Sequence, residues 1–544
     1  MNNEKNDSKK ALQHFIDAHV ARIKPLEIAA RRAYWQAAVS GDSNMYRKAA
    51  EYELKIREIY SNPREFEYVK KIREKQSPED YILKRQTDIL YFRYLQNQIP
   101  AKLRQQIVES GNKIEERFST FRPELNGKKV TDNQILQILK EERNLRLRRE
   151  AWLAGKQVGR LVADELIRLV RLRNQAARHL GFDNYHQMAL RTDEQEPEEL
   201  DYLFDLLESR SKMPFLQAKN EMDSILAQRY QVNVNELKPW HYEDPFFQET
   251  PLVYSVNLDS FYQKQNVEAL ARVFFQSIGL PVDDILAKSD LYERPGKNPH
   301  AFCEDIDKEG DVRILCNLKN NETWMETILH ESGHALYDKH INRTLPYLLR
   351  EQAHIFTTEG IAMLFGRLSR NPFWMQTMLG LSGEQRQKIE SDLFRYMRLK
   401  QLIFVRWVLV MYHFEKQLYL NPEQNLNTLW WKLVRKYQYL NPPEERNYPH
   451  WAAKIHFTIA PCYYHNYLLG EMFASQVHRF IVREIYKGAD WRKVVYIGEQ
   501  KVGNYLKEKI FKVGKLYHWK DMIKQATGYP LKPDDYVDQF FREE

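Results

Sequence analysis

The chain is poor in the residues that staple secreted proteins together. It has three cysteines among 544 residues, Cys303, Cys316 and Cys462, which are too few and odd in number for a disulfide framework. The first seven residues are polar and charged, so they lack the apolar stretch of a secretory signal. These features predict a reducing compartment with free thiols, and we expect a cytoplasmic location.

Long apolar runs are also scarce. The most apolar segment, Leu402 to Phe414, is too short to cross the hydrocarbon core of a bilayer, which takes about 20 residues. It also contains Arg406 and His413. We therefore predict a buried helix there and no membrane partner.

The charge balance argues against a nucleic-acid partner. The chain has 82 Lys and Arg against 74 Asp and Glu, a net charge of +8, without a long basic block or a recognisable nucleic-acid motif. Hydrophobic residues make up 43% of the chain, which is typical of a globular protein.

Helical periodicity dominates the chain. Stretches rich in Leu, Ala, Glu, Lys, Arg and Gln predict a mostly α fold, with long amphipathic helices over about residues 9–110 that form a lid or wall. There is no flexible Gly/Ser linker and no internal repeat, so we expect residues 1–544 to form a single unit.

One segment departs from the helical pattern. Residues 301–306 and 311–318 flank the turn sequence Asp307-Lys308-Glu309-Gly310, which predicts a β-hairpin. An open strand edge can pair with an extended peptide, so the hairpin already suggests a peptide ligand.

The sequence His330-Glu331-Ser332-Gly333-His334 comes after this hairpin, in the next predicted helix. On a helix, residues four apart lie on one face, so His330 and His334 can reach one metal ion. Glu331 can then act as the general base that takes a proton from water. A pattern of five residues also arises by chance in long chains, so it needs a third ligand.

Glu359 is the candidate for that ligand. It lies in a second predicted helix, residues 350–368, after a helix predicted over 324–339. Two imidazoles and a carboxylate with a fourth position left open are typical of catalytic Zn²⁺, although such ligands also accept other divalent ions. A Glu359 that faces solvent is the alternative.

Together these residues resemble the angiotensin-converting-enzyme type of zinc dipeptidyl carboxypeptidase, a group of gluzincin peptidases. Thimet and neurolysin-like oligopeptidases are similar more distantly. Besides the zinc motif, the matching segments are Asn298 to Ala301, Thr358 to Gly360, Trp430 to Tyr437 and Gln476 to His478. The resemblance implies one two-lobed helical peptidase with a deep central channel, a lid near the N-terminus and a zinc-binding core over residues 296–370.

The resemblance also implies roles for residues that bind the peptide. His300 and Ala301 would line the substrate strand. Lys454 and Tyr464 would hold the C-terminal carboxylate of the peptide. His456 would contact the peptide near the scissile carbonyl.

Tyr467 would donate to the oxyanion. From the residues alone, weaker interpretations stay open: core tyrosines at positions 464 and 467, structural histidines at 300 and 456, and a solvated Lys454.

Several positions depart from the family pattern. Met363 stands where relatives carry an Asp that orients a zinc histidine, a role that Asp338 could take over. The glutamine of the carboxylate pocket is replaced near Trp240-His241-Tyr242. Val434 and Asn466 stand where relatives carry chloride-binding arginines, so chloride is not expected as an activator.

The sequence therefore predicts a zinc metallopeptidase that hydrolyses short peptides and releases C-terminal dipeptides. The altered glutamine region leaves an oligoendopeptidase open as an alternative. From another class, an inactive homologue that only binds peptides is the remaining hypothesis.

Overall fold

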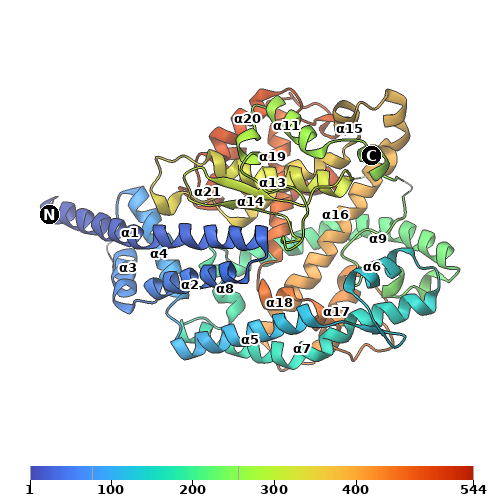
Figure 1. Cartoon of the computed structure of the whole chain (residues 1–544), viewed down its shortest axis with the longest axis horizontal. Coiled ribbons are helices and arrows are strands. Elements are labelled where there is room, and N and C mark those ends of the chain that lie inside the picture. Colours follow the sequence, from blue (N-terminus) through green and yellow to red (C-terminus); the bar gives the residue numbers. More distant parts are fainter. Residues whose placement is uncertain (1, 76, 255, 543–544) are drawn as a thin grey trace. The chain divides into compact units, whose positions relative to one another are not determined.

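The computed structural model describes residues 2–75, 77–254 and 256–542. Met1, the first residue of the segment inspected for an export signal, lies outside this range. Helices make up most of the described chain, and its named strands form two small two-stranded sheets (Figure 1). The predicted mostly α fold is confirmed.

The chain forms two compact units, each built from separate segments. Unit 1 consists of Met1–Gln98, Asn257–Glu390 and Leu469–Asp535, and unit 2 consists of Ile99–Val256, Ser391–Leu468 and Tyr536–Glu544. The single peptidase unit over residues 1–544 and its central channel stay predictions.

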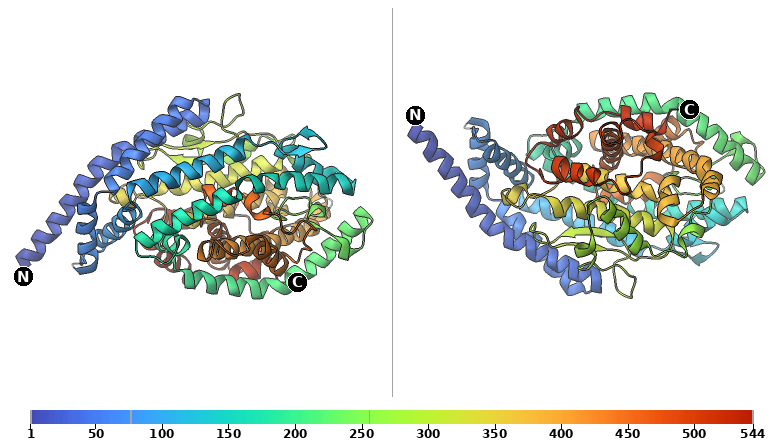
Figure 2. Two further views of the ribbon diagram at one scale, coloured as in Figure 1. Left: turned by 90° about the horizontal axis from the view of Figure 1, so that it is seen from below. Right: turned by 90° about the horizontal axis from the view of Figure 1, so that it is seen from above.

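Unit 1 begins with the helices α1 (Asn2–Ser40), α2 (Ser43–Tyr60), α3 (Pro63–Lys75) and α4 (Tyr81–Gln96). Asp80 starts α4 by accepting hydrogen bonds from the N–H groups of Ile82 and Leu83. Helices α1 and α2 run side by side (Figure 2). Ile16, Leu90 and Leu348 belong to one buried apolar cluster, so these helices pack on the segment that precedes the helix of Glu359.

Buried ion pairs reinforce that packing. The ammonium of Lys308, in the turn of the hairpin, lies 3.0 Å from Glu27 of α1 and 2.6 Å from Glu351. Arg93 of α4 lies 2.6 Å from the same Glu351. The N-terminal helices are thus tied to both the hairpin and the chain that leads into α14 (Ile355–Gly366).

The predicted hairpin is present in unit 1. Strands β3 (Phe302–Asp305) and β4 (Val312–Leu315) are antiparallel, with Phe302 opposite Leu315. Both strands contact α13 (Glu322–His340), the helix predicted over residues 324–339. The side chain of Asn321 caps α13 by accepting from Trp324 N–H. The hairpin and the helix that carries His330 and His334 were therefore predicted correctly.

Further elements of unit 1 are α10 (Asp259–Tyr262), α11 (Val267–Ser277), α12 (Asp283–Leu286), η3 (Tyr347–Leu349), η4 (Arg367–Arg370), α15 (Pro372–Leu379), η6 (Trp491–Lys493), α20 (Gln500–Leu506), η7 (Lys507–Phe511) and α21 (Trp519–Thr527). Helices α16 (Gly383–Leu420), α19 (His465–Glu484) and α22 (Asp534–Phe540) contribute residues to both units.

Unit 2 contains α5 (Ala101–Thr120), β1 (Glu124–Leu125), β2 (Lys128–Lys129), α6 (Asp132–Glu141), α7 (Leu145–His179), α8 (Tyr185–Thr192), α9 (Pro197–Tyr230), η1 (Val234–Glu236), η2 (Pro239–His241), α17 (Leu426–Gln438), η5 (His450–Ala453) and α18 (His456–Ile459). Helix α5 packs along α7 (Figure 2). The apolar run from Leu402 to Phe414 lies within α16 and is largely buried, as predicted. Among the described helices, none is both long and apolar enough to span a bilayer.

Candidate active site

Two helices of unit 1 bring three potential metal ligands together. His330 and His334 lie one turn apart on α13, and their Nε2 atoms are 3.2 Å apart. Glu359 of α14 places Oε2 3.7 Å from Nε2 of His330 and 3.8 Å from Nε2 of His334. The three predicted ligands therefore converge on one point.

These separations fit a tetrahedral zinc ion. Zn–N bonds of about 2.0 to 2.1 Å at tetrahedral angles place neighbouring ligand atoms about 3.3 Å apart. Burial, with a contribution from His330, holds the pKa of His334 well below its usual value, which favours the neutral imidazole that binds metals. Within the described residues, no second group of three such side chains comes this close together.

Two glycines allow α14 to pack closely against its neighbouring helices, α13 and α19. A Cβ atom at Gly333, between the two histidines, would lie 2.7 Å from the Cα atom of Ala362 on α14. A Cβ atom at Gly360 would lie 2.8 Å from the carbonyl oxygen of Gly470 on α19. A side chain at Gly333 would push α13 and α14 apart, and one at Gly360 would push α14 away from α19, so both glycines help to place Glu359 beside the histidines.

Thr358 supports one of the ligands. Its Oγ1 atom lies 2.7 Å from Nδ1 of His334, which leaves Nε2 of that ring for a metal. Asp338 does not take the orienting role considered for it. Its carboxylate accepts a hydrogen bond from Gln352 instead. That part of the sequence interpretation was wrong, because Asp338 points toward the segment before α14.

Glu331 is nearly enclosed, with 7% of its surface exposed. Burial, together with the neighbouring Glu359 carboxylate, raises the pKa of Glu331 to about 8. A dication held beside Glu331 would act in the opposite direction, because a positive charge favours the carboxylate. A desolvated carboxylate next to an open metal position is suited to accept a proton from water.

The hairpin places two further predicted residues in unit 1. Ala301 is half-buried and directly precedes β3, outside the ladder that joins β3 to β4. His300 is exposed, and its backbone N–H donates to Oδ1 of Asn298 at 2.9 Å. Their assignment to the substrate strand stays a prediction.

The other predicted peptide-binding residues gather in unit 2. Lys454 is buried, with 7% exposure, which rules out the solvated surface charge. Its Nζ donates to Oε1 of Gln248 at 2.6 Å, and it lies 5.4 Å from the centre of the Tyr464 ring. Desolvation lowers the pKa of Lys454 to about 8, although Asp244 and Glu249 oppose the shift.

Gln248 is a residue that sequence reasoning missed. We placed the altered glutamine position near residues 240–242, but a glutamine lies beside Lys454 after all. Asp244 holds the turn that carries it, because Oδ1 of Asp244 accepts from the N–H groups of Phe246 and Gln248 at 2.8 and 3.0 Å. The spacing from Trp240 to Gln248 carries no helical or strand pattern that would have revealed this.

His456, Tyr464 and Tyr467 lie next to one another. The rings of His456 and Tyr464 are 5.2 Å apart, and those of Tyr464 and Tyr467 are 5.5 Å apart. Desolvation, with a smaller contribution from Lys454, lowers the pKa of His456 to about 4, so its ring is neutral near pH 7. A neutral imidazole beside two phenols provides hydrogen-bond donors without a fixed charge.

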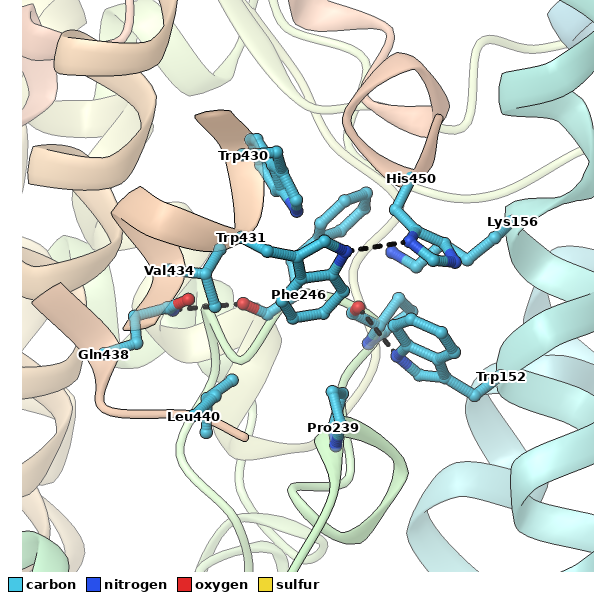
Figure 3. Close-up of a pocket in the computed structure, with 11 residues that line it drawn as sticks. Trp152, Lys156, Pro239, Phe246, Trp430, Trp431, Val434, Gln438, Leu440 and His450 are labelled. Carbon is cyan, nitrogen blue, oxygen red and sulfur yellow. Dashed lines mark hydrogen bonds between the residues drawn. The ribbon is translucent and has the colours of Figure 1, made fainter. Parts of the chain in front are cut away.

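Asn466 and Val434, which the resemblance places where relatives carry arginines, have different neighbours. Nε2 of Gln195 donates to Oδ1 of Asn466 at 2.7 Å, and Oε1 of Gln195 lies 2.7 Å from Nε2 of His465. Val434 lines a small pocket with Trp152, Lys156, Phe246, Trp430 and His450 (Figure 3). Burial holds the pKa of Lys156 well below its usual value.

The described chain is mostly helical, and its His-Glu-x-x-His sequence meets Glu359 in an arrangement that could hold one metal ion. Residues 138–541, well over half of the chain, match Peptidase family M3. The chain belongs to this family. Every residue that we predicted for the site, from His300 to Tyr467, lies within the matched range.

Curated relatives are distant and agree with the resemblance. The chain is 24% identical to the angiotensin-converting enzyme of Rattus norvegicus over 276 residues, which are 48% of this chain and 20% of the relative. Identity to the enzyme of the same name from Mus musculus is 25% over 273 residues, which are 47% of this chain and 20% of the relative. Identity to carboxypeptidase 1 of Bacillus subtilis (strain 168) is 23% over 303 residues, which are 51% of this chain and 57% of the relative. The chain thus spans about a fifth of the converting enzymes and little more than half of the carboxypeptidase.

Proposed function

We propose that the protein is a zinc peptidase that hydrolyses short peptides and releases dipeptides from their C-terminal ends. The observation that carries the hydrolytic part is the convergence of Glu359 Oε2 on the Nε2 atoms of His330 and His334, at 3.7 and 3.8 Å. Family membership and the names of the relatives, one of them a carboxypeptidase, support the same class of reaction.

Bound zinc would polarise the scissile carbonyl and make water more acidic. Glu331 then has the role of the general base: it takes a proton from the attacking water and returns it to the leaving amine. Its position next to His330 on α13 keeps the carboxylate beside the ligands. Thr358 fixes the ring of His334 through Nδ1.

Tyr467 and His456 would stabilise the oxyanion of the tetrahedral intermediate. Both are neutral donors in the same cluster of unit 2, where His456 and Tyr464 are ring neighbours. Removal of one oxyanion donor typically lowers kcat by about a hundredfold or more. We assign these roles to the chain's own side chains and expect His300 and Ala301 to bind the peptide backbone.

The exit of dipeptides depends on recognition of the terminal carboxylate. The Lys454 ammonium, the amide of Gln248 and the phenol of Tyr464 form a group suited to a carboxylate. Gln248 at this place favours the carboxypeptidase over the oligoendopeptidase, which would not need a free C-terminus. An inactive peptide-binding homologue is disfavoured because Glu331 and all three ligands are present.

The test compares an N-acetylated octapeptide with a free C-terminus and the same peptide ending in an amide. Each is incubated with the zinc-loaded protein, and the products are read by mass spectrometry. Dipeptides released from the free acid alone support the proposal. Internal cuts in both peptides would favour an oligoendopeptidase, and single amino acids would favour a carboxypeptidase of one-residue steps.

The Glu331→Gln variant is the matched control, since glutamine keeps the size of the side chain but cannot accept the proton. It should bind zinc and lose cleavage by about a thousandfold or more, as expected when a general base is removed from a metal-assisted reaction. Cleavage that persists in this variant would point to a contaminating protease. Absence of cleavage in the zinc-loaded parent would favour the peptide-binding homologue.

A further inference from the structure

Trp407 lies behind Tyr464 in unit 2. It sits on α16 and is fully buried, with 0% exposure. Its indole Nε1–H donates to the phenol oxygen of Tyr464 at 2.8 Å, and the two rings are perpendicular with centres 6.0 Å apart. The indole therefore occupies an acceptor position of the Tyr464 hydroxyl.

This contact decides how the hydroxyl can act. A phenol has one proton to donate and few positions to accept, and an indole N–H can only donate. With the acceptor side turned to Trp407, the Tyr464 proton points away from the indole. Within the described residues, Trp407 is the one hydrogen-bond partner of this hydroxyl. Burial also raises the pKa of Tyr464, so the proton is retained at neutral pH.

The surroundings of Lys454 suggest what the Tyr464 hydroxyl donates to. The Lys454 ammonium lies 5.1 Å from the centre of the Trp407 ring, 5.4 Å from that of Tyr464 and 5.4 Å from that of Phe246. Three aromatic rings thus lie around a cation whose one hydrogen-bond partner within the described residues is Gln248, at 2.6 Å, while the carboxylates of Asp244 and Glu249 also act on it electrostatically. We call the rings of Phe246, Trp407 and Tyr464 the aromatic cage of Lys454. A carboxylate bound by the Lys454 ammonium would lie near the ring of Tyr464, whose hydroxyl could then donate to it.

We propose that Trp407 is a positioning residue that keeps the Tyr464 hydroxyl a donor toward the C-terminal carboxylate and thereby rejects peptides that end in an amide. A carboxylate only accepts hydrogen bonds, whereas a terminal amide also presents an NH₂ group that needs acceptors. A Tyr464 hydroxyl whose acceptor position is taken by Trp407 is a poor acceptor for that group. This inference deepens the proposed function and depends on its carboxylate-binding part.

The preference for the acid over the amide depends on the unpaired NH₂ group of the amide as much as on the attraction between Lys454 and the carboxylate. An NH₂ group left unpaired in a buried site loses its hydrogen bonds to water without replacement. Without the indole N–H, the hydroxyl could rotate, accept from the amide and donate less often to the acid. Loss of Trp407 should therefore weaken binding of the acid while it leaves binding of the amide unchanged or stronger.

The experiment measures binding by calorimetry in the zinc-loaded Glu331→Gln background, where peptides are not cleaved. The probes are the N-acetylated octapeptide acid and its C-terminal amide. Trp407→Phe keeps an aromatic ring and removes the donor. We expect Kd for the acid to rise about tenfold and Kd for the amide to stay within about twofold, the scale of one hydrogen bond to a charged group.

Tyr464→Phe identifies the partner. If Trp407 acts through Tyr464, adding Trp407→Phe to Tyr464→Phe should cause no further loss of preference for the acid. The effects of the two substitutions on the ratio of the Kd values would then not be additive. An acid preference lost in Tyr464→Phe and kept in Trp407→Phe would overturn the inference and leave the proposed function standing. A parent that binds acid and amide equally would overturn both.

Two controls separate positioning from packing. Trp374 is a fully buried tryptophan of unit 1 whose Nε1 has no hydrogen-bond partner among the described residues, so Trp374→Phe should not change the acid-to-amide ratio. If Trp407→Phe fails to fold, β-(3-benzothienyl)alanine at position 407 keeps the bicyclic shape and lacks the N–H. An unchanged acid-to-amide ratio in that protein would equally overturn the inference.

Discussion

The Nδ1 atom of His334 lies 2.7 Å from the hydroxyl oxygen of Thr358, the residue that directly precedes the third ligand, Glu359. One turn of α14 thus supplies both a ligand and the support of another ligand. Relatives were expected to use a carboxylate one turn later, where this chain has Met363. A neutral hydroxyl takes over the orienting role here and adds no negative charge to the site.

Loss of the Thr358 hydroxyl should weaken the metal site. Thr358→Val keeps the shape of the side chain and removes the hydrogen bond to His334. We expect zinc affinity to fall by about tenfold, in line with other residues that orient zinc histidines. Competition with a chromogenic chelator measures the change.

Thr358→Ser retains the hydroxyl and should keep zinc affinity near that of the parent. If the valine and serine variants bind zinc equally well, the contact to His334 has no role in metal binding.

Gly333 should tolerate no side chain. In Gly333→Ala the new methyl group would lie 2.7 Å from Cα of Ala362 and 3.1 Å from the carbonyl oxygen of Ile361, both backbone atoms that move only with α14. Separation of α13 and α14 draws Glu359 away from the histidines. We expect zinc affinity to fall by about tenfold or more and the protein to lose about 1 to 3 kcal/mol of stability from overpacking.

Gly111→Ala is the matched control, because it lies within α5 and a Cβ atom there would meet nothing within 4 Å. It should leave zinc affinity unchanged and raise thermal stability slightly, since alanine favours helices. Normal zinc affinity in Gly333→Ala would show that the helices can separate without loss of the site.

The meeting of the two candidate histidine ligands could be predicted because their signal is local. His330 and His334 are four residues apart, and a helix alone places them on one face. The hairpin before them could be predicted from its turn and its β-branched strand. Convergence of Glu359 is different, since it depends on close helix contacts at Gly333 and Gly360 that no periodicity reveals.

Contacts across long stretches of sequence were the ones missed. Gln248 and Lys454 are 206 positions apart, and no sequence pattern near either residue indicates that they are in contact. Asp338 was considered as a support of the zinc ligands because a carboxylate is the usual partner of such histidines. The nearer hydroxyl of Thr358 was overlooked, although Thr358 belongs to the segment that carried the resemblance.

Recognition of a free C-terminus should weaken at alkaline pH. The charged form of Lys454 attracts the carboxylate, and desolvation lowers the pKa of Lys454 from 10.5 to about 8. The ammonium is therefore lost as pH rises through about 8, well below the usual range for lysine. We expect KM for an N-acetylated free-acid peptide to be constant below that pH and to increase by up to about tenfold per pH unit above it.

Lys454→Arg tests the assignment, because a guanidinium keeps its charge throughout this range. Its KM should be higher at neutral pH, since the shape of the cation changes, but should stay flat where the KM of the parent rises. If KM rises with pH in the same way in both proteins, the increase above about pH 8 is caused by another group.

Chloride should not activate the protein. Asn466 and Val434 stand at the positions where relatives were expected to carry arginines, and Asn466 is engaged in a neutral network with Gln195. Lys156, which lies in the same pocket as Val434, is a cation by type, but its burial holds its pKa well below the usual value and disfavours the charge that an anion would need. We expect cleavage rates to differ by less than about twofold between chloride and acetate at about 0.15 M, where exposed charges are screened alike by both salts.

Lys156→Met makes this test sharper, because it removes the cation that lines the same pocket as Val434 and puts an unbranched apolar side chain in its place. Since the Lys156 Nζ has no hydrogen-bond partner within the described residues, the methionine should raise thermal stability rather than lower it. Cleavage of the free-acid peptide should be equally indifferent to chloride in both proteins. Stimulation by chloride that vanishes in Lys156→Met would show instead that the buried lysine is charged and binds the anion, so a single cation would replace the missing arginines.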